Sequence, residues 1–232
     1  SRLLVEGYGA DPEKITVGRP GTDPARGVRR AGAPPLVLSV GIQHPRKGHD
    51  VLLRALAQLT DLEWRAEIVG TPWDEPFAAA LPRLRDELGL AERVRIAGGI
   101  GNDELDELWA EASVFALATR YEGYGLVFDE ALAWGVPIVS CRTGAVPETV
   151  PAEAGMLVPP DDPRAFAGAL RTAVTDHARR DRMTRAARAA GARLPSWLDT
   201  ARVARGVLES VTRRSPTPRS AFIDIEAPKP EH

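Results

Sequence analysis

Residues 122–130, which read Glu-Gly-Tyr-Gly-Leu-Val-Phe-Asp-Glu, are the part of this chain best suited to chemistry. Glu122 and Glu130 stand at the two ends of the segment, and a carboxylate accepts hydrogen bonds from sugar hydroxyls, bidentately from a vicinal diol. The glycines between them favour a loop, and an apolar helical pattern begins near Leu126. Amides of such a loop and of the first helical turn suit an anion. We expect both carboxylates to reach one ligand, although each alone also suits a surface position or a helix N-terminus.

A second loop, residues 41–48, directly follows an apolar run at residues 36–40. Gly41 lets a ligand approach the backbone closely. Arg46 and Lys47 then place positive charge beside a helix start, where phosphate is favoured. The loop has neither the Gly-Lys-Ser/Thr order of a phosphate-binding P-loop nor the dinucleotide pattern Gly-x-Gly-x-x-Gly. A solvated turn with two surface cations is the alternative interpretation.

Two shorter turns follow further apolar runs. Gly99 and Ile100 come after residues 94–97, and their backbone groups could face a nucleobase or form a plain glycine turn. Residues 144–148, Gly-Ala-Val-Pro-Glu, follow the run at residues 137–140. Pro147 and Glu148 favour the start of a short helix there.

The elements that must position these loops alternate regularly between strand and helix. Apolar runs predict strands at residues 36–40, 67–69, 94–97, 114–117, 137–140 and 155–158. Helical spacing predicts helices at residues 50–57, 77–88, 103–111, 127–134 and 163–174. This alternation is typical of an α/β fold whose parallel sheet has helices on both faces. In such sheets ligands bind beyond the carboxyl ends of the strands, which is where all these loops lie.

The two ends of the chain differ from this pattern. Residues 1–8 read as a short helix and residues 15–17 as a short strand, and a Gly/Pro-rich stretch follows them. Residues 178–211 predict Ala/Arg-rich helices broken around residues 194–197. The tail from Arg213 is rich in Pro, Ser and charge, a composition typical of disorder.

Composition narrows the classes of function. The chain has 232 residues, 44% hydrophobic and 27% charged, with a formal net charge of -2, and these values are typical of a soluble globular protein. Acidic and basic residues are interspersed, so nothing points to nucleic acid as a partner. The single cysteine, Cys141, fits a reducing compartment, and no apolar run is long enough to span a membrane. We therefore expect a cytoplasmic protein without a transmembrane segment; peripheral membrane association of the full enzyme is left open.

These loops, in this order, resemble the C-terminal domain of family 4 retaining glycosyltransferases, which have the two-domain GT-B architecture. The resemblance runs from about Leu36 to Val174. It rests on the Glu-x7-Glu pattern from Glu122 to Glu130, on Lys47-Gly48, and on the Gly-x-x-Pro-Glu turn from Gly144. The fold implied is a Rossmann-like parallel sheet with helices on both faces.

The resemblance also implies roles for the loop residues. The activity would be transfer of a hexose from a nucleoside diphosphate sugar, such as a UDP- or GDP-sugar, to an acceptor hydroxyl with retention of configuration. Lys47 and Glu122 would be catalytic, and neither a metal ion nor a further cofactor is expected. The donor would be bound by Gly41, Arg46, Lys47, Gly99, Ile100, Glu122, Gly123, Tyr124, Gly125, Leu126, Val127 and Glu130.

The family's organisation suggests a division of the chain. Residues 32–177 would form the donor-binding domain, and residues 1–31 the remnant of an N-terminal acceptor domain with its linker. Residues 178–212 would be helices that pack toward that missing domain, and residues 213–232 a disordered tail. The isolated fragment is then expected to be inactive alone.

One departure and several alternatives accompany this assignment. The family usually has arginine directly after the first strand's glycine, where this chain has Ile42. Neutralising a diphosphate must then depend on Lys47 with Arg46 or His44. The alternatives are an inactive nucleotide or nucleotide-sugar binding module and another GT-B enzyme, such as a nucleotide-sugar epimerase or a phosphorylase. A dehydrogenase is disfavoured because the dinucleotide glycines are absent.

Overall fold

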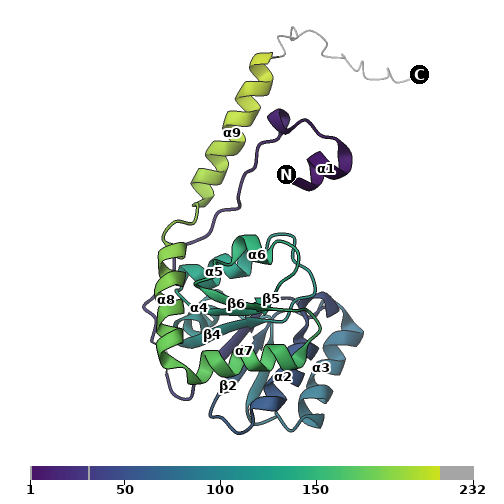
Figure 1. The fold of residues 1–232 in the computed structure, drawn as a ribbon, viewed down its shortest axis with the longest axis vertical. Helices are drawn as coiled ribbons and strands as arrows, with labels where there is room; N and C mark the ends of the chain where they lie inside the picture. Colours follow the sequence, from purple (N-terminus) through teal and green to yellow (C-terminus); the bar gives the residue numbers. More distant parts are fainter. Residues whose placement is uncertain (1, 31, 215–232) are drawn as a thin grey trace, which may run out of the picture. The chain divides into compact units, whose positions relative to one another are not determined.

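A parallel six-stranded sheet of order β3-β2-β1-β4-β5-β6 forms the centre of the fold (Figure 1). The structure is a computed structural model that describes residues 2–30 and 32–214. Neighbouring strands pair in parallel throughout, so their carboxyl ends lie along one edge. The winding direction reverses between β1 and β4, which makes this pair the topological switch point. The strands are β1 (Leu36–Val40), β2 (Arg65–Val69), β3 (Val94–Gly98), β4 (Ala112–Leu117), β5 (Ile138–Cys141) and β6 (Gly155–Val158).

Helices connect and extend these strands. The α-helices are α1 (Arg2–Tyr8), α2 (His49–Leu56), α3 (Glu75–Glu87), α4 (Asn102–Glu111), α5 (Leu126–Ala133), α6 (Val146–Thr149), α7 (Pro163–Thr175), α8 (His177–Gly191) and α9 (Trp197–Arg214). Short 3-10 turns are η1 (Pro12–Lys14), η2 (Pro45–Lys47) and η3 (Ala57–Leu59). Side-chain caps by Asp74, Asp162 and Asp176 begin α3, α7 and α8.

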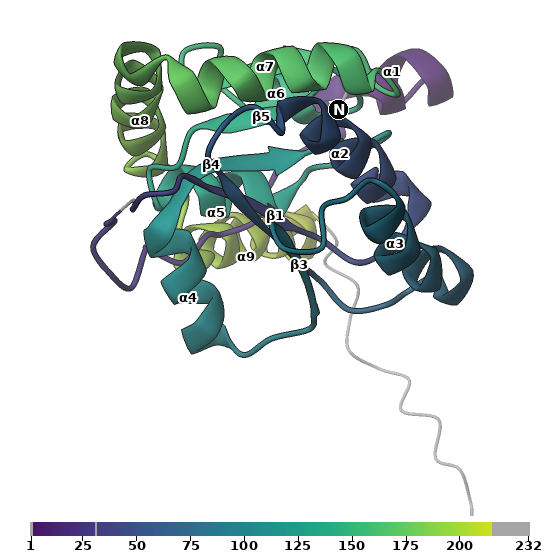
Figure 2. The same cartoon turned by 90° about the horizontal axis from the view of Figure 1, so that it is seen from below.

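The sheet separates two apolar layers because successive strand residues face opposite sides. Val37 and Ile68 face the layer made with α2, α3 and α7. Leu36, Leu38 and Phe115 face the layer made with α4, α5 and α8. Figures 1 and 2 show α2, α3 and α7 together on one face of the sheet. The predicted fold class, a Rossmann-like parallel sheet with helices on both faces, is confirmed.

The ends of the chain depart from the sequence-based expectation in one respect. The strand predicted at residues 15–17 is wrong, because these residues have no regular structure. Val17 is 64% exposed, and no described strand pairs with the segment, so its backbone has no sheet to join. The predicted break between the last helices is confirmed between α8 and α9. Of the predicted tail, Arg213 and Arg214 end α9, and residues 215–232 lie outside the described residues.

Contacts divide the described residues into two compact units, one within residues 20–197 and the other formed by residues 2–19 and 198–214. Within the larger unit, Arg29 joins the stretch just before β1 to the rest of the fold. Its guanidinium donates to the carbonyl oxygens of Ala112 (3.0 Å) and Gly135 (2.8 Å) and to Thr184 Oγ1 (2.9 Å). Burial, with nearby Arg188 and Arg180, lowers the pKa of Arg29 to about 10. One half-buried cation therefore joins the linker to β4, the α5–β5 turn and α8.

Candidate functional site

The turn after β1 is shaped by its caps. The backbone amide of Gly41 continues the sheet by donating to Val69 O (2.8 Å). His44 begins η2, and its Nδ1 accepts a hydrogen bond from the amide of Arg46 (3.0 Å). Gly48 ends the turn with φ +66°, and a Cβ at this position would lie 2.0 Å from Ala118 O. Only glycine therefore lets the turn that carries Arg46 and Lys47 lie against the exit of β4.

Lys47, Arg46 and Glu122 form a cluster at the switch point between β1 and β4. Glu122 is only 4% exposed, and Lys47 is 8% exposed. Lys47 Nζ lies 2.6 Å from Glu122 Oε1, while Arg46 Nη1 lies 3.3 Å from Oε2. One buried carboxylate thus holds two cations, one at each oxygen. Burial makes such charges costly unless they are paired, so this arrangement keeps the cations in fixed positions.

Of the two candidate partners of Lys47, the cluster contains Arg46 and not His44. Sequence analysis left Arg46 and His44 as alternatives. The His44 ring is occupied in capping η2, whereas the Arg46 guanidinium bonds Glu122 and the carbonyl of Tyr121 (2.8 Å). Ile42, in the position where a family arginine was expected, brings no charge to the cluster. Arg46 is therefore the second cation at this site.

Thr119 and Gly144 hold Glu122 in place, and sequence analysis did not identify Thr119. Thr119 Oγ1 lies within hydrogen-bond distance of Arg46 O (3.0 Å), Tyr121 O (3.1 Å) and Glu122 Oε1 (3.3 Å). The amide of Ala145 donates to Glu122 O (2.9 Å). A Cβ on Gly144 would lie 2.2 Å from that carbonyl oxygen, so the turn after β5 needs glycine to approach. A threonine after a buried strand carries no recognisable sequence signal for this role.

The loop at residues 123–127 ends in an exposed helix start. Gly125 precedes α5 with φ +85°, and a Cβ there would lie 2.5 Å from Phe128 Cδ2. Among the described residues, none accepts a hydrogen bond from the backbone amides of Gly123, Gly125, Leu126 or Val127. Amides at a helix N-terminus carry partial positive charge and suit an anion. They lie one loop away from the cations of the cluster.

Tyr124 and Glu130 have different surroundings from Glu122. The Tyr124 hydroxyl donates a hydrogen bond to buried Asp129 (2.7 Å), which ties the Tyr124 side chain to α5. Glu130 lies in a pocket of about 230 Å³ formed by linker residues, α4, α5 and Trp197. Burial, together with the charges of Asp129 and Asp23, raises the pKa of Glu130. No direct contact joins the two glutamates in the described part of the chain, so one ligand would have to extend from the buried cluster to this pocket.

Gly99 and Ile100 lie at the carboxyl end of β3. The amide of Gly70 donates to Gly98 O (2.7 Å), and a Cβ on Gly99 would lie 2.7 Å from Thr71 Cγ2. Gln43, which sequence analysis missed, is buried and ties the β1 and β2 exits together. Its Nε2 donates to Gly70 O (2.9 Å), and its amide to Thr71 O (2.9 Å). The exits of β3, β2, β1 and β4 thus form one continuous rim.

A parallel sheet with cations and free helix amides at its switch point is the arrangement that α/β proteins use to bind phosphorylated ligands. A family model described as glycosyl transferases group 1 matches residues 25–190. The chain belongs to this family.

Individual relatives agree. D-inositol 3-phosphate glycosyltransferase of Kineococcus radiotolerans is 34% identical over 253 residues, which cover 94% of this chain and 58% of that protein. Sucrose-phosphate synthase of Thermosynechococcus elongatus superposes with a TM-score of 0.71 at 30% identity, covering 78% of this chain and 46% of that one. HepE of Anabaena in complex with UDP and glucose has the same fold, with a TM-score of 0.67 at 24% identity over 77% of this chain and 48% of that one.

The chain spans about half the length of the curated relatives it matches, with 58%, 42% and 46% of three of them covered. Its fold is a Rossmann-like α/β fold that matches GT-B glycosyltransferase structures. No described helix is long and apolar enough to cross a membrane. The described residues also contain no cluster of His, Cys, Asp or Glu side chains arranged to hold a metal ion.

Proposed function

We propose that this chain is the donor-binding half of a family 4 retaining glycosyltransferase. The donor is a nucleoside diphosphate hexose, such as a UDP- or GDP-sugar, and the acceptor is a hydroxyl held by an N-terminal domain outside this chain. The observation that carries the proposal is the pairing of Lys47 (2.6 Å) and Arg46 (3.3 Å) with buried Glu122 at the switch point. Free helix amides beside this cluster complete a site for a diphosphate.

The donor extends along the rim in this proposal. Its diphosphate lies against Lys47, Arg46 and the amides at the start of α5. Glu122 accepts hydrogen bonds from the sugar hydroxyls, and Glu130 accepts them from the ribose. Gly99 and Ile100 border the base, because they lie on the same rim beyond the exit of β2. The binding of UDP and glucose by HepE supports this class of donor.

The reaction breaks the bond between the anomeric carbon and the diphosphate oxygen, and the electron pair leaves with the diphosphate. The acceptor oxygen forms the new bond on the same face of the sugar, and its proton passes to the departing phosphate. Lys47 and Arg46 stabilise the charge that develops on the leaving group. Removing one such electrostatic contact costs about 10²–10³ in rate.

The test uses the intact protein that contains this domain, with UDP-glucose and GDP-mannose as first donors. Lys47→Ala should lower kcat by about 10²–10³-fold. Lys14→Ala, which removes a lysine whose side chain is 79% exposed, serves as the matched control and should leave kcat unchanged. The anomeric configuration of the product, read by proton NMR, should equal that of the donor. Near-normal turnover of Lys47→Ala, or an inverted product, would contradict the proposal.

The cellular setting belongs to the same proposal. The enzyme works in the cytoplasm, where nucleotide sugars are available, with peripheral membrane association of the full enzyme left to its other domain. Activity recovered in the soluble fraction of lysed cells, or released from membranes by salt, is the expected result. Activity that requires detergent for extraction would contradict it.

A further inference from the structure

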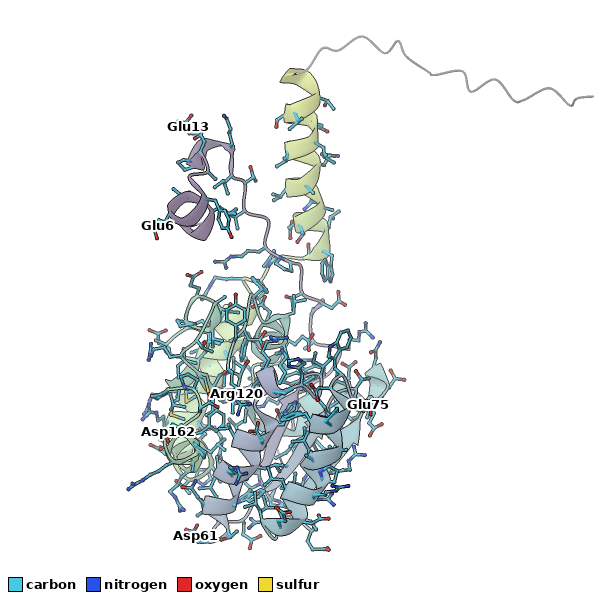
Figure 3. All side chains as sticks on the ribbon, turned by 90° about the vertical axis from the view of Figure 1, so that its right-hand side faces the viewer. Glu6, Glu13, Asp61, Glu75, Arg120 and Asp162 are labelled. Atoms are coloured by element: carbon cyan, nitrogen blue, oxygen red, sulfur yellow. The ribbon has the colours of Figure 1, made fainter. Side chains whose placement is uncertain are left out.

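We propose that Arg120 is a positioning residue, which keeps the turn carrying Arg46 and Lys47 aligned with Glu122. It lies two residues before Glu122, at the exit of β4, and Figure 3 labels it. The inference rests on the proposed donor site. It assigns to Arg120 a part in shaping that site without contact to the donor.

The Arg120 side chain joins three segments of the carboxyl edge. Its Nη1 and Nη2 donate to Asp50 Oδ1 (3.0 Å) and Oδ2 (2.9 Å), in the first turn of α2. Its Nε donates to Asp161 Oδ1 (2.6 Å), in the loop after β6. Nη1 also donates to Pro45 O, the carbonyl that accepts the Gly48 amide (3.1 Å) and closes η2. The guanidinium is thus attached to the very turn that carries both cations.

The main chain of Arg120 repeats the same connection. Its amide donates to Arg46 O (2.8 Å), and its carbonyl accepts a hydrogen bond from Thr143 Oγ1 (2.9 Å) in the turn after β5. Together with the side chain, these bonds link the exits of β4, β5 and β6 to η2. A displacement of η2 relative to β4 would have to break several of them at once.

The contacts of Arg120 distinguish positioning from direct ligand binding. A guanidinium has five N–H donors. Its Nε, Nη1 and Nη2 atoms make four hydrogen bonds to Asp50, Asp161 and Pro45, so little donor capacity is left for a ligand. These acceptors, above all Asp50, raise the pKa of Arg120. Burial opposes ionisation of Asp50, yet the bonds and charge of Arg120 hold its pKa below the ordinary value.

The backbone conformation of Asp161 also supports a positioning role for Arg120. Asp161 is the one non-glycine residue with a positive φ (56°) among those the structure describes. Non-glycine residues rarely adopt a positive φ unless their surroundings hold the backbone there, and Asp and Asn tolerate it best. The 2.6 Å bond from Arg120 is the described contact that holds it. The β6 loop is therefore constrained in the same network.

The first measurement compares Arg120→Met with Arg171→Met. Arg171 also forms a bidentate ion pair with an aspartate, Asp61 (2.7 and 2.8 Å). Figure 3 shows that Asp61 lies well away from Arg120. Calorimetry with UDP and GDP should show the affinity lowered about 10–100-fold in Arg120→Met and unchanged in Arg171→Met. Arg120→Lys, which keeps the charge without the fork, should fall between Arg120→Met and the wild type.

The second measurement reads the position of Lys47 without any donor. Trace acetylation with acetic anhydride, followed by mass spectrometry, gives the reaction rate of Lys47 relative to exposed Lys14. The Lys47 side chain is 10% exposed in the wild type. Releasing η2 should raise its relative rate several-fold in Arg120→Met and leave it unchanged in Arg171→Met. If Arg120→Met does not fold, Arg120→Lys and Asp161→Asn take its place. Both should weaken nucleotide binding and speed the acetylation of Lys47, by smaller factors than expected for Arg120→Met.

The two measurements are read together. Weaker binding together with faster acetylation of Lys47 supports positioning. Weaker binding with unchanged acetylation would show instead that Arg120 contacts the ligand, and unchanged values of both would overturn the inference. If the wild type binds no nucleoside diphosphate, the proposed function fails, and the acetylation rates alone decide the role of Arg120.

Discussion

Glu122 is an acid enclosed by protein and balanced by two cations. Replacing one partner of a buried ion pair leaves the other charge uncompensated, which commonly costs about 3–5 kcal/mol. The 2.6 Å contact to Lys47, whose side chain is 10% exposed, belongs to this class. The surface pairs elsewhere in the chain, such as Arg202 with Asp199, are worth much less.

Glu122→Ala should therefore lower the free energy of unfolding by about 3–5 kcal/mol. Glu122→Gln should cost less, because an amide oxygen still accepts from Lys47. Urea unfolding followed by circular dichroism measures both. Glu153→Ala, at an exposed position, is the control and should stay within about 0.5 kcal/mol of wild type. If Glu122→Ala is as stable as the control, Glu122 does not compensate the buried charge of Lys47.

His49 makes the stability of the chain depend on pH. The residue is fully buried, its Nε2 lies 3.1 Å from Gly41 O, and Nδ1 has no partner among the described residues. Burial lowers its pKa from 6.5 to about 4, against the opposing effect of the carbonyls of Gly41 and Ile42. Between about pH 4 and pH 6.5 the unfolded chain therefore binds a proton at His49 that the folded chain does not.

The free energy of unfolding should consequently fall as pH drops from 6.5 toward 4, with His49 contributing up to about 1.4 kcal/mol per pH unit. His49→Gln keeps an N–H donor for Gly41 O and removes the titration. Urea unfolding at several pH values should give a shallower slope for this variant over that range. All carboxylates are common to both chains, so equal slopes would mean that His49 does not titrate as described.

At the scale of elements, the strands and helices beside the site could be predicted well. Fully buried strands such as β4 are continuous apolar runs, and glycine or polar residues mark where they end. Parallel order then brings their carboxyl ends together, which is why Lys47 and Glu122 could be expected near each other. Thr119, Gln43 and Arg120 could not, because their roles come from contacts between loops distant in sequence.

The strand predicted at residues 15–17 shows where prediction from the sequence fails. A β-branched run predicts a strand only where a neighbouring strand can pair with it, and sequence pattern does not reveal the neighbour. The separate surroundings of Glu122 and Glu130 are a similar case. Their spacing brings both near the start of α5, but the linker and Trp197 that line the pocket of Glu130 come from elsewhere in the chain.

Gly48 tests how closely α2 must approach β4. Gly48→Ala adds a Cβ that would lie 2.0 Å from Ala118 O, at φ +66°. Gly89→Ala meets nothing within 4 Å at a similar φ of +68°, so it carries the backbone strain alone. Both should lose about 1 kcal/mol from the left-handed conformation, and Gly48→Ala at least about 2 kcal/mol more from the clash. Thermal unfolding of the two variants gives the difference, and equal losses would contradict the close approach.

At the scale of the whole molecule, the two compact units differ in how much core they contain. Both clusters of buried apolar residues lie within residues 20–197. Helix α9 instead exposes apolar side chains, with Leu208 66% and Val211 57% accessible. The larger unit therefore holds the interactions that stabilise the sheet and the rim of loops.

Residues 20–197 alone should fold, with a Tm within a few degrees of the full chain. The reason is that removing the other unit takes away neither core cluster. Calorimetric melting of the two chains provides the comparison, and their nucleotide affinity should also agree. A truncated chain that is unfolded, or that melts at a much lower temperature, would show that the smaller unit contributes to the stability of residues 20–197.

The proposed donor site must bind a nucleoside diphosphate, and titration calorimetry measures that binding. The chain would be titrated with UDP, GDP, ADP and NAD, alongside Lys47→Ala and the matched control Lys14→Ala. We expect UDP or GDP to bind, NAD to give no heat, Lys47→Ala to weaken binding at least tenfold and Lys14→Ala to leave it unchanged. Binding of NAD, or a nucleoside diphosphate affinity that is the same in Lys47→Ala and wild type, would contradict the account.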